Sequence, residues 1–206
     1  MKNKKSIYGD KPELKKEDIS AENIATDKFS EISYSMDIND AIIYMIGEIG
    51  EFSFYDFATR CRTILRERPE QKSGEPITLV INSSGGCMFE MFGIIDYIKS
   101  LKVKVNVIVR GQAMSAAAMI LATATGSRIC SKHTTIMLHE ASIGQYGKSS
   151  DIQASAKQYK KMEDDCIKLL AESTKKDEAW WKENTRKDLF LSADEALELG
   201  IIDLIG

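Results

Sequence analysis

The apolar residues in the middle of the chain predict strands and helices that alternate. Runs at residues 41–46, 77–82 and 102–110 have the length and composition of strands, whereas residues 54–67 and 88–101 carry apolar side chains at helical spacing. Alternation of this kind favours right-handed crossovers between parallel strands. We therefore expect an α/β fold with a mainly parallel sheet.

Proline, glycine and serine mark the turns between these elements. Residues 69–76 are polar and contain two prolines, and residues 83–86 (SSGG) follow directly on the strand at 77–82. Gly111 ends the next strand, and the small and apolar residues 113–120 predict a buried helix after it. We expect Ser115 to lie about one turn into this helix.

The second half of the chain continues with shorter elements and one long helix. We expect strands at 128–131, 134–138 and 201–205, an extended piece at 142–148, and helices at 151–173, 178–185 and 192–199, the last with Ser192 at its start and Gly200 at its end. The apolar side of the helix at 151–173 is wider than a two-layer domain needs to bury, so part of it should contact a partner. Residues 1–30 are polar and of mixed charge, and we interpret them as a flexible arm or removable leader.

Composition narrows the class of protein. The 206 residues are 43% hydrophobic, which supports one domain with a substantial core, and a net charge of −3 gives no basic surface for nucleic acid. The four cysteines include no CxxC pair, which favours reduced thiols in the cytoplasm over disulfides or a zinc site. No apolar run is long enough to cross a membrane, and the N-terminus lacks the features of a signal or transit peptide. We expect no metal and no cofactor.

Ser115 is the first candidate for chemistry, because it is a hydroxyl in an otherwise apolar run after a strand. A helix N-terminus carries free N–H groups and partial positive charge, which stabilise an oxygen that becomes negative during a reaction. We interpret Ser115 as a nucleophile. The plainer alternative, which this stretch alone favours, is a core serine bonded to a carbonyl one turn earlier.

Two further features converge on the same edge of the predicted sheet. Gly85 and Gly86 let the backbone approach a substrate closely, so the N–H groups of Gly86 and Ala116 are candidates to bind one oxyanion. His139 follows the strand at 134–138 and can take a proton from Ser115, whereas we assign a structural role to the other histidine, His133. The orienting carboxylate stays open on these grounds, with Glu140, Asp151, Asp164, Asp165 and Asp188 as candidates.

Taken together, these segments resemble the Clp protease family, the proteolytic subunit of the ATP-dependent Clp protease, from about residue 33 to residue 206. The resemblance rests on INSSGG (81–86), GQAMSAAA (111–118), MLHE (137–140), the glycine-containing segment before Asp151, and KDLFLSADEALELGIID (187–203). It implies that Ser115 is the nucleophile, His139 the general base and Asp188 the orienting acid. It also implies oxyanion donors at Gly86 and Ala116, and the surroundings of Ser115 depart from the G-x-S-x-G pattern of α/β-hydrolases.

The resemblance also implies an architecture and an assembly. The fold would be that of the Clp protease and crotonase group, with an α/β head (31–141 and 174–206) and a protruding handle of strand and helix (142–173). Two heptameric rings would stack through the handles, so that homo-oligomers enclose the active sites. The polypeptide substrate would lie along the handle strand, with contacts that we assign to Gly85, Met114, Ser142, Ile143, Gly144 and Gln145.

Departures from the family pattern leave alternatives for partner and activity. Thr78 and Val80 stand where relatives often carry aromatic residues that receive a loop of an AAA+ unfoldase, and residues 1–30 do not match the usual axial loop. Besides an unfoldase-fed serine endopeptidase, the alternatives are a processing protease that needs no ATPase and a catalytically silent ring subunit. A crotonase-type acyl-CoA enzyme is less favoured, because it has no need for serine, histidine and aspartate together.

Overall fold

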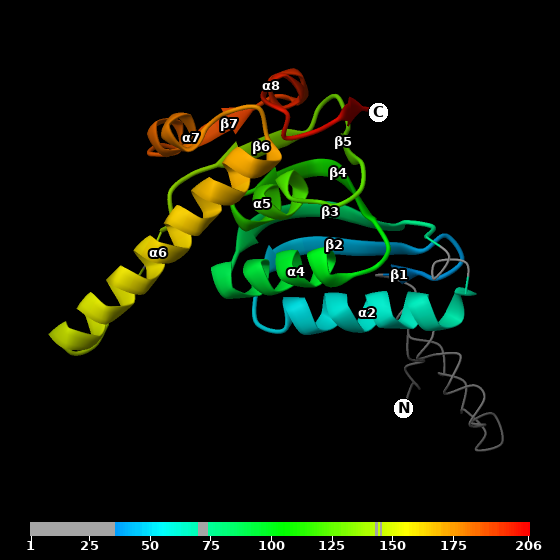
Figure 1. The fold of residues 1–206 in the computed structure, drawn as a ribbon, viewed down its shortest axis with the longest axis horizontal. Helices are drawn as coiled ribbons and strands as arrows, with labels where there is room; N and C mark the ends of the chain where they lie inside the picture. Colours follow the sequence, from blue (N-terminus) through cyan, green and yellow to red (C-terminus); the bar gives the residue numbers. More distant parts are fainter. Residues whose placement is uncertain (1–35, 70–73, 143, 145) are drawn as a thin grey trace, which may run out of the picture. The chain divides into compact units, whose positions relative to one another are not determined.

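A mostly parallel sheet organises the part of the chain that the computed structural model describes. The structure describes residues 36–69, 74–142, 144 and 146–206. The central strands β2 (Ile42–Ile49), β3 (Ile77–Gly86) and β4 (Val105–Met114) are parallel, and β1 (Met36–Asp37) pairs antiparallel with β2. This arrangement, drawn in Figure 1, confirms the expected α/β fold with a mainly parallel sheet.

The sheet divides at the far edge of β4. The first half of β4 pairs with β5 (Arg128–Cys130), which continues to β8 (Leu204–Ile205), and its second half pairs with β6 (Thr135–Leu138). Strand β6 then pairs antiparallel with β7 (Leu189–Leu191). The second half of β4 therefore lies between β3 and a two-stranded extension, and this is where the candidate residues gather.

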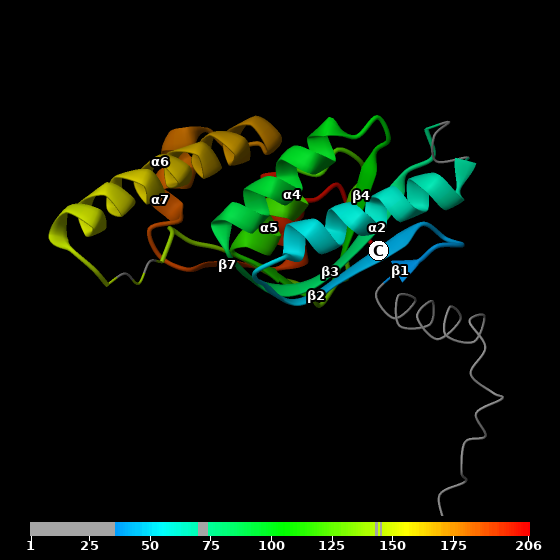
Figure 2. The ribbon, with the colours of Figure 1, turned by 90° about the horizontal axis from the view of Figure 1, so that it is seen from below.

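Helices cover one face of the central strands, as Figures 1 and 2 show. These helices are α2 (Ser53–Glu67), α4 (Met88–Ser100) and α5 (Ala116–Ala122). Ile77, Leu79 and Ile81 of β3 point to this face and are fully buried, whereas Thr78 and Val80, on the opposite face, are only half-buried. The core thus forms between the sheet and these helices, where burial of apolar surface stabilises both layers.

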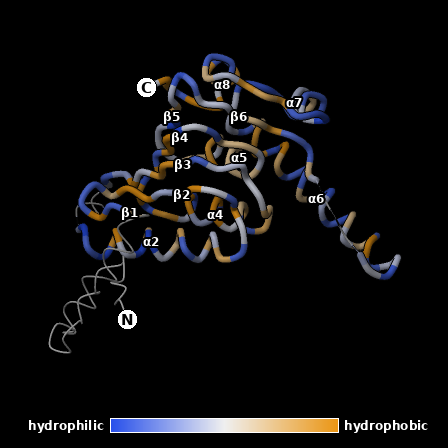
Figure 3. Tube along the Cα trace, turned by 180° about the vertical axis from the view of Figure 1, so that it is seen from behind, coloured by the Kyte–Doolittle hydropathy of each residue, from blue (hydrophilic) through white to orange (hydrophobic). Residues whose placement is uncertain are grey.

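The C-terminal helices are α6 (Ser149–Ser173), α7 (Glu178–Asn184) and α8 (Ala193–Leu199). The second half of α6 packs on the domain through Met162, Ile167 and Leu170, while its first half contains no buried residue and extends past the sheet (Figure 1). Figure 3 shows hydrophobic and hydrophilic residues mixed along this helix. Ile152, in this first half, is 38% exposed, and the contact of α6 with a partner stays a prediction.

Helix α8 begins and ends where the sequence predicts. The Ser192 side chain accepts a hydrogen bond from the Glu195 N–H, the Glu195 carboxylate accepts one from the Ser192 N–H, and Gly200 closes the helix in the left-handed region with φ of +76°. This reciprocal pair satisfies two backbone donors that the first turn otherwise leaves open. The predicted start at Ser192 and end at Gly200 are therefore confirmed.

Several boundaries differ from the prediction. Strand β3 continues through Gly86, and β4 continues through Gly111 to Met114, because pairing with β2, β3 and β6 carries the ladder past the glycines. The strand predicted at 201–205 is reduced to Leu204–Ile205, and β1 and β7 were not predicted. Residues 142, 144 and 146–148 are not in a strand. The predicted arm at 1–30 and residues 70–73 of the predicted turn at 69–76 lie outside the described residues.

Candidate functional site

Ser115 occupies the sharp turn between β4 and α5, not a position inside the helix as the sequence predicted. Its N–H donates to the Met137 carbonyl at 2.7 Å, which extends the β4–β6 ladder, and its carbonyl accepts the Met119 N–H at 3.1 Å, which begins the helix. The residue serves both elements by adopting φ of +53° and ψ of −122°, a conformation that costs of order 1–3 kcal/mol for a side chain with a Cβ atom. Strain of this kind is typical of strand-to-helix turns that present a nucleophile.

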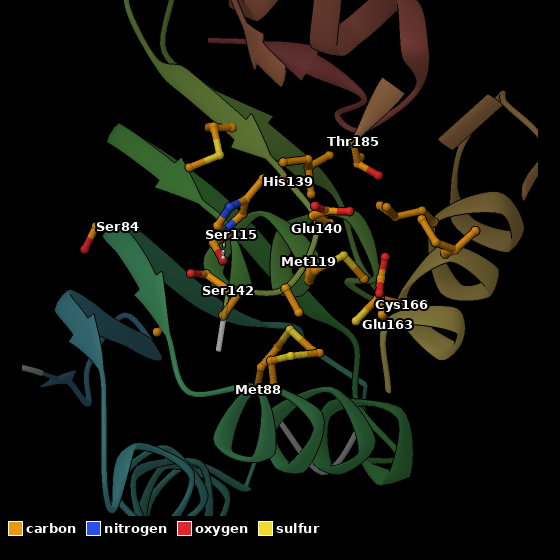
Figure 4. Close-up of a pocket in the computed structure, with 18 residues that line it drawn as sticks. Ser84, Met88, Ser115, Met119, His139, Glu140, Ser142, Glu163, Cys166 and Thr185 are labelled. Carbon is orange, nitrogen blue, oxygen red and sulfur yellow. Dashed lines mark hydrogen bonds between the residues drawn. The ribbon is translucent and has the colours of Figure 1, made fainter. Parts of the chain in front are cut away.

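The alternative of a core serine bonded to an earlier carbonyl does not hold for Ser115. Its side chain makes no capping hydrogen bond to α5, and it is half-buried. The Oγ atom instead lies 2.9 Å from Nε2 of His139, as the dashed line in Figure 4 marks. The hydroxyl is therefore paired with a group that can accept its proton.

Gly85 explains why the backbone of β3 can pass beside this turn. A Cβ atom at residue 85 would lie 2.4 Å from the Met114 carbonyl oxygen and 2.8 Å from the Ser115 Cβ, and Gly85 has φ of +92°. The Gly85 N–H donates to the Oγ of the buried Ser83 at 3.1 Å. The second glycine, Gly86, lines the cavity beside Ser115. The SSGG segment thus supplies close approach, as expected, although it does so as strand.

His139 is positioned by the end of β6 and by the segment that follows. It comes directly after Leu138, the last residue of β6, and the Glu140 N–H donates to the Thr185 carbonyl at 2.7 Å just beyond α7. The His139 side chain is 24% exposed, so most of the ring is buried. His133, to which we assigned a structural role, lies exposed in the turn between β5 and β6.

Asp188 reaches His139 through the register of two antiparallel strands. Leu138 of β6 pairs with Leu189 of β7, so His139 and Asp188 occupy the next facing positions. The Oδ1 atom of Asp188 lies 3.6 Å from Nδ1 of His139, and the Asp188 side chain is 59% exposed. This distance is longer than that of a hydrogen bond, and catalytic contacts of this kind often tighten only when substrate binds. Within the described residues, no other carboxylate forms an ion pair with His139.

A cavity of about 300 Å³ opens beside Ser115, which we call the Ser115 cavity. Ser115, Ala116 and His139 stand at one side, methionines from α4, α5 and β6 line it, and α6 forms a wall with Glu163, Cys166, Ile167 and Leu170. Burial raises the pKa of the Cys166 thiol to about 12, and the negative charges of Asp165 and Glu163 act in the same direction. The thiol therefore stays protonated and behaves as part of an apolar lining.

The remaining predicted site residues divide into three groups. Gly86, Ala116 and Ser142 line the Ser115 cavity, and the Ala116 N–H, at the first position of α5, has no partner within the helix. Met114 is half-buried at the end of β4, and Gly144 is exposed. Ile143 and Gln145 lie outside the described residues.

Other residues of this region gave no signal in the sequence. Thr185 lies in a polar segment, yet it is buried, and its carbonyl accepts a hydrogen bond from the Glu140 N–H. Ser83, two residues before Gly85, is also buried. Met88, Met119 and Glu163 sit at ordinary helical positions, and only their shared cavity relates them to Ser115 (Figure 4). The described residues contain no group of three or more side chains suited to a metal ion, and none of their helices has both the length and the apolarity to cross a bilayer.

The chain matches a known protein family over most of its length. The family model named Clp protease matches residues 26–206, which is most of the chain. The matched region contains Ser115, His139, Asp188 and every residue of the Ser115 cavity.

Proposed function

The chain belongs to the Clp protease family, a family of peptidases, and on this premise we propose that it is a serine endopeptidase acting on unfolded polypeptides or peptides. One observation carries the proposal: Nε2 of His139 lies 2.9 Å from Oγ of Ser115, with Asp188 on the far side of the ring. A hydroxyl, an imidazole that takes its proton and a carboxylate that orients the imidazole together form the proton path of acyl transfer, in which the proton moves between the hydroxyl, the imidazole and the leaving group.

In the proposed reaction, Ser115 Oγ attacks the carbonyl carbon of the scissile peptide bond while His139 Nε2 takes its proton. The imidazolium then protonates the leaving amine, and the peptide C–N bond breaks to give an acyl-enzyme. A water molecule then gives a proton to His139 Nε2 while its oxygen attacks the ester carbon. The bond from that carbon to Ser115 Oγ breaks, Oγ takes the proton back from His139, and the acid product leaves. Asp188 holds the ring with Nδ1–H toward itself and stabilises the imidazolium in both steps.

The N–H groups of Gly86 and Ala116 are the proposed oxyanion donors. Both residues line the Ser115 cavity, and the Ala116 N–H belongs to the first turn of α5, where no carbonyl of the same helix can accept it. Donors that are fixed before the reaction stabilise the tetrahedral intermediate by several kcal/mol, about 2.7–4 for a single donor in a comparable enzyme. The strained turn at Ser115 supports this role, since it puts the hydroxyl and the amide of the next residue at one place.

We further propose that the active sites are enclosed by two stacked heptameric rings, with α6 as the contact between rings. The first half of α6 contains no buried residue, and Ile152 on it is 38% exposed, which supports a surface that needs a partner. Segment 142–148 would guide the substrate as an added strand beside this handle.

An AAA+ unfoldase is a proposed partner, and an enzyme that works without one is the second candidate. What favours the second is the outer face of the sheet, where Thr78 and Val80 replace the aromatic residues expected at an unfoldase docking site. The two candidates differ in one result: the second cleaves a protein substrate without nucleotide or unfoldase.

The test of the peptidase is a fluorophosphonate, which reacts with an activated serine. We expect mass spectrometry to find the adduct on Ser115, and Ser115→Ala to lower cleavage of a short fluorogenic peptide by about 10³-fold or more. A chain that forms no adduct and cleaves no peptide leaves the silent ring subunit as the better description, whereas a Ser115→Ala variant that cleaves as fast as the wild type removes Ser115 as the nucleophile.

A further inference from the structure

The α6 wall of the Ser115 cavity carries a carboxylate, and we infer that this cavity selects peptides with lysine or arginine on the acyl side of the cleaved bond. The inference rests on the proposed peptidase and names the substrate class that its cavity prefers. It concerns Glu163, a residue that has no part in the proposed proton path.

The position of Glu163 is the first observation. It lines the same cavity as Ser115 and His139, and Figure 4 shows its side chain beside Cys166, on the side of α6 that faces the cavity. The side chain is 22% exposed, whereas that of its neighbour Asp164 is 48% exposed. Glu163 is thus the carboxylate of this pair that a bound side chain would meet.

The lining between Ser115 and Glu163 is the second observation. Met88, Met91 and Met119 present flexible thioether side chains, and Ile167 and Leu170 add apolar surface from α6. A lysine or arginine side chain has an aliphatic stem of three or four methylene groups, which packs against apolar surface while its charged end reaches a polar partner. The cavity volume of about 300 Å³ accommodates such a side chain.

The balance of charge is the third observation. Two carboxylates, Glu140 and Glu163, line the cavity, and no arginine or lysine is among the described residues that do so. The pKa of the Cys166 thiol on the same wall is raised mainly by burial, and the charges of Asp165 and Glu163 add to that rise. A cation is therefore stabilised there, whereas an acidic substrate side chain would lose its hydration against like charge.

Lys160 already forms an ion pair with Glu163, so a substrate cation would have to share this carboxylate with it. Its Nζ lies 3.0 Å from Oε2 of Glu163 and 3.6 Å from Oδ1 of Asp164, but its side chain is 54% exposed. A carboxylate has about four acceptor positions, so Glu163 can bind Lys160 and a substrate cation together. Lys160 can also turn toward Asp164 or solvent at small cost, because exposed ion pairs are weak.

The experiment compares fluorogenic peptides that differ only at the residue before the cleaved bond, which is lysine, arginine, norleucine or glutamate. For the wild type we expect kcat/KM for lysine or arginine to exceed that for norleucine about tenfold, as for one charge-assisted hydrogen bond, with glutamate the poorest. Glu163→Gln keeps the size of the side chain, and it should remove most of the lysine preference, so that the ratio of kcat/KM for the lysine peptide to that for the norleucine peptide falls toward one.

Two neighbouring variants serve as controls. Asp164→Asn removes the other partner of Lys160 without touching the cavity, so it should leave the preference as it is. Lys160→Met removes the competing cation, and it should raise the lysine preference about twofold or more. Cleavage of the norleucine peptide by every variant shows that the protein is folded.

The outcomes separate this inference from the proposed function. Wild-type protein that cleaves norleucine peptides faster than lysine peptides, or a Glu163→Gln variant with an unaltered preference, overturns the inference and leaves the peptidase intact. Absence of cleavage for all four peptides, together with no fluorophosphonate adduct on Ser115, overturns the peptidase itself.

Discussion

The backbone of Gly85 passes so close to Ser115 that a Cβ atom at residue 85 would lie 2.8 Å from the Ser115 Cβ. The two residues are 30 positions apart in the sequence, and they meet because β3 and β4 are neighbours in the sheet. The same contact brings the Met114 carbonyl oxygen within 2.4 Å of that Cβ position. The shape of the proposed nucleophile turn thus depends on the absence of a side chain on the adjacent strand.

Gly85→Ala should therefore damage both activity and stability. The new methyl group must displace the Met114–Ser115 backbone, and alanine must adopt φ of +92°, so we expect a loss of about 1–3 kcal/mol in the free energy of unfolding. Peptide cleavage should fall at least tenfold, because a displaced Ser115 leaves its hydrogen bond with His139. Urea denaturation and a fluorogenic peptide measure the two effects. Gly50→Ala is the control, since nothing lies within 4 Å of a Cβ there.

Asp188→Asn should lower activity without unfolding the protein. The Asp188 side chain is 59% exposed, and its Oδ1 lies 3.6 Å from Nδ1 of His139. Its charge therefore affects the orientation and protonation of the imidazole more than the stability of the fold. We expect kcat to fall by about 10²–10⁴-fold with little change in the melting temperature. Asp151→Asn, at the exposed start of α6, should behave as the wild type. Equal activity of the two variants would remove Asp188 from the triad.

The four thiols should differ in reactivity toward iodoacetamide. Cys87 is exposed and should be modified first, while Cys61 and Cys130 are completely buried. Burial raises the pKa of both Cys61 and Cys166 to about 12, so neither forms appreciable thiolate near neutral pH. Peptide mapping by mass spectrometry should find one labelled cysteine in the native protein and four in denaturant. Rapid labelling of Cys166 in the native protein would contradict its description as a protonated thiol in the lining of the Ser115 cavity.

The pairing of Arg128 with Asp203 should make part of the stability depend on acid pH. Hydrogen bonds from Arg128 hold the pKa of Asp203 below its usual value of 3.8. A lowered pKa in the folded state means that the contribution is fully present above about pH 3.8 and is lost as the pH falls through the folded-state value. Because the Asp203 side chain is 46% exposed, we expect Asp203→Asn to cost only about 1 kcal/mol at pH 7.

The measurement for this pair is urea denaturation of wild type and variant at a series of pH values. The difference between their free energies of unfolding should shrink as the pH falls below 4. Asp56→Asn removes a more exposed carboxylate, paired with Arg60 one turn away, and should change stability by a few tenths of a kcal/mol. A difference for Asp203→Asn that is the same at pH 3 and pH 7 would assign its effect to shape instead of charge.

Ile152→Glu should separate the proposed rings without unfolding the chain. The residue lies in the half of α6 that contains no buried side chain, so a charge is tolerated in the isolated chain but costs free energy in an apolar contact. Native mass spectrometry should give a particle of half the wild-type mass. Gln153→Glu introduces the same charge at the neighbouring exposed position and should keep the larger particle. Wild-type protein that is monomeric at every concentration would contradict the stacked rings.

The layers of the fold and the grouping of the candidate residues were easier to predict from the sequence than the local geometry was. Alternating apolar runs predict β3, α4 and β4 because burial between two layers imposes a pattern on each element. The capping box of α8 is a local feature of four residues, so Ser192 and Gly200 were predicted correctly. The family resemblance selected Asp188, which composition and spacing left among five carboxylates, and the structure puts it beside His139.

The errors fall where long-range pairing overrides local preference. Gly111 looks like the end of a strand, yet β4 continues to Met114 because β6 offers a second partner beyond β5. This extension moves the start of α5 to Ala116 and turns Ser115 from a helix residue into the strained residue of a turn. No local pattern predicts β7 either, because its three residues form a strand only by pairing with β6.

The division of the sheet has a consequence for the order in which the site can be completed during synthesis. Ser115 directly follows a strand that can form once β3 and β4 have left the ribosome, but Asp188 reaches His139 only after β7 has docked on β6. A growing chain therefore holds its hydroxyl well before it holds the acid that orients the base. A chain interrupted before residue 188 would therefore lack the carboxylate that the proposed mechanism needs beside His139.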